Sequence, residues 1–177
     1  LIGASLKAIR IAEDRERFDA LMARLDIPRP RGRTVTRPGD AVPAARELGY
    51  PVVVRPSYVL GGRAMEIVYN DAEMAEYIET AVEVSNHHPV LVDRYLLGKE
   101  VEVDAVSDGQ TVLIPGIIEH IERAGVHSGD STAVYPTISL NPGVIDAIVG
   151  YTEEICRVLR VVGVINIQFV VHDGMVY

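Results

Sequence analysis

The sequence is poor in cysteine: Cys156 is the only one among 177 residues. An internal disulfide and a zinc site built from several cysteines are therefore both excluded. Cys156 lies on the apolar face of a predicted helix and is interpreted as an inert core thiol. The sequence also lacks an apolar run of the roughly 20 residues that a membrane helix needs, and its first ten residues lack the pattern of a signal peptide. These absences favour a cytoplasmic protein.

Positive charge is also in the minority, with 17 Lys and Arg against 25 Asp and Glu and a net charge of −8. Nucleic acids and anionic membranes recruit proteins through clustered cations, so both are poor candidates as partners. The two commonest glycine signatures of nucleotide phosphate sites, GxxxxGK(S/T) and GxGxxG, do not occur. Any phosphate site must therefore be built differently.

The best candidate for such a phosphate site is the segment from Arg55 to Arg63. A β-branched run ends here in a cation and leads to the paired glycines Gly61 and Gly62. The amides of such glycines can approach a phosphate closely. A plain turn beside a surface arginine is the alternative interpretation.

The composition, 48% hydrophobic and 24% charged, is that of a globular protein. Apolar residues at helical spacing predict a helix over 14–25. A small α+β unit follows, with Asp40 and Asn70 expected to cap its two helices. The predicted elements are, in order, a strand over 34–36, a helix over 40–49, strands over 51–55 and 65–69, a helix from Asn70 and a strand over 90–95.

The second half of the chain has the pattern of an antiparallel sheet with one long helix. Alternation of apolar and acidic residues around an Asp108-Gly109 turn predicts a hairpin over 100–118. Apolar residues predict a helix over 144–162, and strands are predicted over 164–171 and 175–177. The sequence contains no internal repeat.

Two sets of polar residues alternate with apolar ones along these strands. Glu100, Glu102 and Asp104 are expected on one strand face, where they could bind ribose hydroxyls or a hard cation, or form a solvated surface. Asn166 and Gln168 are expected to project together from another strand. Core amides that bond to the backbone are the alternative for this second pair.

A third polar cluster fills residues 119–131 and includes two histidines, three carboxylates and two hydroxyls. Such polar density in a glycine-containing loop indicates a functional site, with a hydrogen-bonded surface loop as the alternative. A metal hydrolase centred on His120, His127 and Asp130 is one chemistry that these residue types permit.

The residues that carry these candidates resemble one family, the large subunit of carbamoyl phosphate synthetase, and within it the ATP-grasp unit of the carboxy-terminal half. The resemblance lies in four segments, Ala12–Phe18, Tyr50–Tyr69, Glu119–Ser131 and Asn166–Phe169. It implies an α+β ATP-grasp fold, in which ATP is clamped between a small lid subdomain and a larger antiparallel-sheet subdomain.

The resemblance also implies a division of the chain, with the fold cut at both ends. Residues 1–33 would hold the tail of a preceding domain and the first ATP-grasp helix, 34–95 the lid, and 96–177 an incomplete larger subdomain. The family's metal-binding Glu and Asn follow the strand that ends here at Tyr177. The chain alone is therefore expected to bind nucleotide weakly and to be inactive.

Roles for single residues follow from the same resemblance. Arg15 and Arg55 would bind the nucleotide phosphates, with His127 as a third catalytic residue, and Gly61 and Gly62 would lie in the loop that closes over the phosphates. Arg94 and Leu96 would meet adenine in the hinge, and Glu100 would hold the ribose hydroxyls. Gln168 would be a metal ligand. The remaining nucleotide-side residues would be Gly125, Val126, His127 and Ser128.

The activity implied is the ATP-dependent phosphorylation of carbamate to carbamoyl phosphate, for arginine and pyrimidine biosynthesis. ATP and Mg²⁺ or Mn²⁺ would be the cofactors, and a small glutaminase subunit would be the partner. Two further interpretations stay open: a non-catalytic nucleotide-binding or assembly module, and another ATP-grasp ligase such as a biotin-carboxylase-like enzyme.

Overall fold

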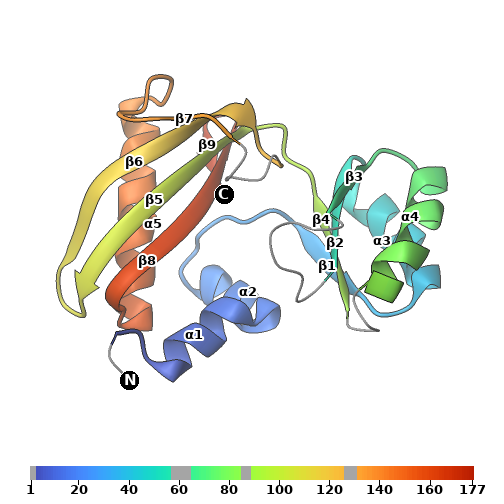
Figure 1. Cartoon of the computed structure of the whole chain (residues 1–177), viewed down its shortest axis with the longest axis horizontal. Coiled ribbons are helices and arrows are strands. Elements are labelled where there is room, and N and C mark those ends of the chain that lie inside the picture. The colour runs from blue at the N-terminus through green and yellow to red at the C-terminus, as the bar shows by residue number, and fades with distance from the viewer. Residues whose placement is uncertain (1–2, 57–64, 85–88, 126–130) are drawn as a thin grey trace. The chain divides into compact units, whose positions relative to one another are not determined.

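The computed structural model describes residues 3–56, 65–125 apart from 85–88, and 131–177. The chain divides into two compact units, residues 30–96 and residues 1–29 with 97–177. Each unit holds one antiparallel sheet with its own hydrophobic core (Figure 1). The α+β class and the antiparallel sheets predicted from the sequence are thus confirmed.

The unit formed by residues 30–96 is a four-stranded sheet covered on one face by two helices. Its strands lie in the order β1-β4-β2-β3, and its helices α3 and α4 pack on the valines of the sheet (Figure 1). The bounds are β1 Gly32–Val35, a 3-10 turn Pro38–Asp40, α3 Ala41–Leu48, β2 Val52–Pro56, β3 Glu66–Val68, α4 Asp71–Val84 and β4 Val90–Arg94.

Of the two predicted helix caps in this unit, one is present and one is not. Asn70 caps α4 as expected: its Oδ1 accepts the Glu73 amide at 3.0 Å, and Glu73 accepts the Tyr69 amide at 2.8 Å in return. Asp40 does not cap α3, which corrects the prediction. Asp40 belongs to the preceding 3-10 turn and has helical backbone angles, whereas a capping residue needs an extended backbone.

The second unit is a five-stranded sheet in the order β7-β6-β5-β8-β9, with α5 along one face (Figure 1). Val101, Val103 and Phe169 point from the sheet into a core shared with Ile148 of α5. Helices α1 and α2 pack on the carboxyl end of α5 through Leu21 and other apolar residues. The bounds are α1 Leu6–Glu13, α2 Arg15–Arg24, β5 Lys99–Asp108, β6 Val112–Arg123, β7 Ala133–Val134, α5 Pro142–Leu159, β8 Val162–His172 and β9 Met175–Val176.

The β5-β6 hairpin turns at Asp108 and Gly109, as predicted. Gly109 has a φ of +92°, which favours glycine, and Asp108 Oδ1 accepts the amides of Gln110 and Thr111 at 2.8 and 2.7 Å. These amides lower the pKa of Asp108. The turn sets the register that pairs Ser107 with Val112, and a register shift between Asp104 and Val106 then places Glu102 opposite Ile118.

Two expectations about element bounds need correction, and one helix was not predicted. The segment that precedes Asp14 contains the helix α1, capped by the Ser5 hydroxyl, which accepts the Ala8 amide at 3.1 Å. Strand β6 continues to Arg123, so residues 119–123 are strand and not loop. Helix α5 ends at Leu159, because Arg160 takes a left-handed conformation and Val162 already pairs with Asp108 in the sheet.

Within the part of the chain that the structure describes, no helix has both the length and the apolar character required to cross a membrane.

Candidate functional site

The face of the large sheet opposite α5 carries the predicted polar residues. Glu102 of β5 lies opposite Gln168 of β8, and Asp104 lies opposite Asn166. Gln168 Nε2 donates to Glu102 Oε1 at 2.6 Å, and Asn166 Nδ2 donates to Asp104 Oδ1 at 2.9 Å. The two amides are exposed and bond to carboxylates, so the alternative of core amides bonded to the backbone is wrong.

A group of metal-capable side chains lies on the same face, next to the Glu102-Gln168 pair. Glu100, Glu102 and His120 each place one ligand atom within 4.8 Å of the others, the only such group among the described residues. The His120 ring is almost fully buried, and its Nε2 lies 3.6 Å from Glu102 Oε1, beyond hydrogen-bond distance. Glu100 accepts the Gly125 amide at 3.4 Å.

The chemistry of this face suits a hard divalent cation better than a soft one. Mg²⁺ prefers carboxylate and amide oxygens, which Glu100 and Gln168 provide, while Glu102 accepts the bond from the Gln168 amide nitrogen. Among the described residues, the Gln168 side chain has a hydrogen-bond partner only at its Nε2, and its carbonyl oxygen accepts no hydrogen bond. The residues present therefore fit the Mg²⁺ that the family resemblance implies.

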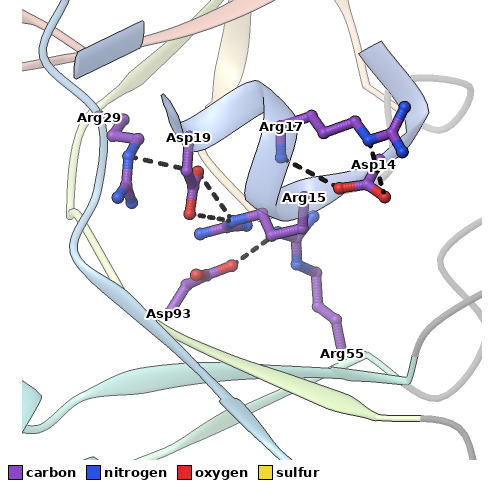
Figure 2. A network of polar contacts seen from close by, with 7 residues as sticks. All are labelled: Asp14, Arg15, Arg17, Asp19, Arg29, Arg55 and Asp93. Carbon is purple, nitrogen blue, oxygen red and sulfur yellow. Dashed lines mark hydrogen bonds and ion pairs between the residues drawn. The ribbon is translucent and has the colours of Figure 1, made fainter. Parts of the chain in front are cut away.

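Arg15, one of the two predicted phosphate-binding arginines, is the first residue of α2 and is held by Asp19 one turn later. Arg15 Nε donates to Asp19 Oδ2 at 3.1 Å, and Arg29 Nε lies 3.2 Å from Asp19 Oδ1 (Figure 2). Two guanidinium groups thus share the Asp19 carboxylate, which holds Arg15 in place on the first turn of α2.

Arg55, the second predicted phosphate-binding arginine, lies near the end of β2 in the other unit. Its guanidinium donates to Asp93 Oδ2 of β4 at 2.6 Å (Figure 2). The Asp93 side chain is 10% exposed and that of Arg55 is 43% exposed. The pair therefore anchors the arginine while its side chain stays partly exposed.

Arg94, predicted in the adenine hinge, also has partners within its own unit. Its guanidinium donates to the Leu48 carbonyl at 3.1 Å, at the carboxyl end of α3. Its amide bonds to the Arg31 carbonyl, and the next amide, of Tyr95, bonds to the Pro51 carbonyl. These bonds fix the backbone that leads to Leu96.

Behind the polar face, a buried carboxylate connects β6 to the segment before α5. Glu119 is fully buried and accepts Lys99 Nζ at 2.7 Å, the amides of Ile138 and Ser139 at 3.0 Å each, and the Ser139 hydroxyl. Burial alone would raise the pKa of Glu119, but these donors outweigh it and lower the pKa to about 2. Glu119 is therefore a structural anion, although the sequence places it in a candidate functional loop.

Several predicted site residues lie outside the described part of the chain: Gly61, Gly62, Val126, His127 and Ser128. Asp130, which belongs to the metal-hydrolase hypothesis, lies outside it too. Of that trio only His120 is described, and its metal-capable neighbours are Glu100 and Glu102.

Sequence reasoning missed the acidic partners of the predicted phosphate-binding arginines. The i,i+4 spacing of Arg15 and Asp19 within one helix was a signal that could have revealed the first pair. The Arg55-Asp93 pair carries no such signal, because 38 residues separate its members.

Comparison of the chain with a family model and with solved structures defines its fold class as ATP-grasp. D-alanyl-alanine synthetase A from Vibrio cholerae superposes with a TM-score of 0.83 at 19% identity, over 99% of this chain and 56% of that one. Biotin carboxylase from Campylobacter jejuni gives 0.85 at 19% identity, over 99% and 41%. The biotin carboxylase domain of the Hydrogenobacter thermophilus 2-oxoglutarate carboxylase, in complex with MgADP, ADP and bicarbonate, gives 0.82 at 20% identity, over 99% and 40%.

The chain itself belongs to the family described as the carbamoyl-phosphate synthase L chain, ATP binding domain, whose model matches residues 14–177. The predicted ATP-grasp fold is confirmed by this match and by the structural likeness. The chain spans 40 to 56% of the length of the three structures, and at 19 to 20% identity they show the fold alone.

Proposed function

We propose that this chain is the ATP-binding part of the carbamate-phosphorylating half of a carbamoyl phosphate synthetase large subunit. The observation that carries the proposal is the segment from Glu119 to Ser131, whose sequence resembles that half. Membership of the carbamoyl-phosphate synthase family supports the same assignment. The lid is then residues 34–95 and the larger subdomain 96–177, a division that the compact unit 30–96 supports.

The reaction transfers the γ-phosphoryl group of ATP to an oxygen of carbamate. A bond forms between that oxygen and the γ-phosphorus, the bond from the γ-phosphorus to the β,γ-bridging oxygen breaks, and ADP leaves. Such a transfer needs alignment and charge neutralisation more than covalent catalysis. Arg15 and Arg55 bind the phosphates in this proposal, with His127, Gly61 and Gly62 beside them.

The nucleotide and its metal occupy the polar face of the large sheet in the same proposal. Glu100 holds the ribose hydroxyls and Gln168 binds Mg²⁺ through its amide oxygen. When bound, the cation neutralises charge on the transferring phosphate. The adenine side is formed by Arg94 and Leu96, and the nucleotide and acceptor side is lined by Gly125, Val126, His127 and Ser128. A glutaminase partner and a role in arginine and pyrimidine biosynthesis belong to the same proposal.

The decisive experiment replaces Arg55 by alanine in the full-length protein and measures carbamate-dependent ATP turnover. Loss of a phosphate-binding cation should lower turnover about 100-fold or more. The matched control is Arg33→Ala, because Arg33 also lies on a strand of the same unit and pairs with a carboxylate, that of Glu47. Equal turnover of wild type and Arg55→Ala would refute the phosphate role of Arg55.

The choice of acceptor separates the proposal from its alternatives. Wild-type protein is assayed for ATP hydrolysis with carbamate, with bicarbonate plus biotin, and with D-alanine. Stimulation by carbamate supports the proposal, and stimulation by bicarbonate plus biotin alone favours a biotin-carboxylase-like enzyme. Tight Mg·ATP binding with no stimulation by any acceptor would favour a non-catalytic module.

A further inference from the structure

The hydrogen bond between Gln168 and Glu102 has a chemical direction. A carboxylate accepts hydrogen bonds and donates none, so Gln168 must turn its NH₂ group toward Glu102. The 2.6 Å bond from Gln168 Nε2 to Glu102 Oε1 has this orientation. The carbonyl oxygen of Gln168, the only atom of its amide that can bind a cation, is then on the other side of the group.

Glu102 itself is held firmly enough to impose this orientation. It lies in the middle of β5, between β6 and β8, and is paired in register with Ile118 on one side and Gln168 on the other. Its side chain is 17% exposed, whereas Gln168 is exposed. The buried ring of His120 lies 3.6 Å from the same oxygen, Oε1. Packing thus restricts the carboxylate, and the carboxylate orients the more exposed amide of Gln168.

We infer that Glu102 is a positioning residue: it holds the NH₂ group of Gln168, so that the amide oxygen is turned away from the carboxylate and kept available to bind a divalent cation. This inference rests on the proposed function, in which Gln168 binds the metal. Partners behind a metal ligand typically contribute about 10- to 100-fold to metal affinity, because they fix the ligand in its binding orientation. Replacing Glu102 by glutamine keeps its size but lets the Gln168 amide bond to it in either orientation.

The chain contains a closely matched control for loss of charge. Asp104 lies two residues along the same strand, on the same face, and accepts an equivalent bond of 2.9 Å from Asn166. Asp104 does not belong to the metal-capable group of Glu100, Glu102 and His120. Asp104→Asn therefore removes the same charge from the same face without disturbing Gln168.

The experiment measures Mn²⁺ binding by electron paramagnetic resonance in the full-length protein, with a non-hydrolysable ATP analogue present. Glu102→Gln should weaken Mn²⁺ binding about tenfold, while Asp104→Asn should bind like wild type. Affinity for the analogue in the presence of a metal chelator should be the same in all three proteins. In a Gln168→Ala background, adding Glu102→Gln should cause no further loss, because the inferred effect acts through Gln168.

Each other result has a distinct meaning. If the wild-type protein shows no nucleotide-dependent Mn²⁺ binding, both the proposed function and this inference are overturned. Unchanged binding by Glu102→Gln, or equal losses in Glu102→Gln and Asp104→Asn, would overturn only the positioning role. A tenfold loss that persists in the Gln168→Ala background would also overturn it, because Glu102 would then act directly on the metal.

Discussion

Glu119 offers the sharpest test of how the large sheet is stabilised. Replacing it by glutamine keeps the side-chain size but removes a charge that accepts bonds from Lys99, Ser139 and Ile138. The folded state lowers the pKa of Glu119 from 4.5 to about 2. This shift corresponds to about 3 kcal/mol of stability at pH 7, and breaking a buried ion pair typically costs a similar amount.

The sign of the pH dependence follows from the lowered pKa. Because the folded protein binds the proton less tightly than the unfolded chain, the contribution of Glu119 is complete above pH 4.5 and is lost as the pH falls toward 2. At pH 3 about 1 kcal/mol should remain. The stability difference between wild type and Glu119→Gln should therefore narrow from about 3 to about 1 kcal/mol between pH 7 and pH 3.

Urea unfolding followed by far-ultraviolet circular dichroism measures this difference, since the chain contains no tryptophan. Hydrogen exchange at the Ile138 and Ser139 amides gives a local readout of the same bonds. The control is Glu122→Gln on the same strand, whose more exposed carboxylate accepts bonds from Ser131 and Thr132, so its replacement should change the stability much less than Glu119→Gln does. A Glu119→Gln protein within 1 kcal/mol of wild type at pH 7 would contradict the reasoning.

Two other predictions concern packing. Cys156 is buried, and burial raises the pKa of its thiol. The thiol should therefore not react with a disulfide reagent at pH 8 until denaturant unfolds the protein. Rapid labelling of the native protein would contradict this prediction. A Cβ at Gly98 would lie 2.5 Å from the Val171 carbonyl, so Gly98→Ala should cost about 1 to 3 kcal/mol in urea unfolding. Gly150 in α5 has open space around it, so Gly150→Ala should instead stabilise by up to about 1 kcal/mol, and equal effects of the two changes would refute this packing argument.

Local sequence signals predicted the structure correctly where residues close together in the chain determine it. The capping box at Asn70, the Asp108-Gly109 turn and the alternation of β5 all formed as predicted, because each depends on residues within a few positions. The two-residue strand β7 lies beyond such signals, since it is too short to show a period. Helix α1 had a signal in the Ser5 cap, but this segment was interpreted as the tail of another domain.

Only the tertiary structure decided which polar side chains meet. Sequence periodicity put Glu102 and Gln168 each on a polar strand face, but 66 residues separate them, and the register of β5 against β8 made them partners. The same holds for the burial of Glu119: its polar neighbours in sequence predicted a loop, whereas Lys99 and Ser139, 20 residues away on either side, determined its environment. The sequence determines the hydrophobic period of each element and the chemistry of its residues. Pairing across a sheet depends on contacts between segments far apart in the chain, and no local pattern predicts which of these segments meet.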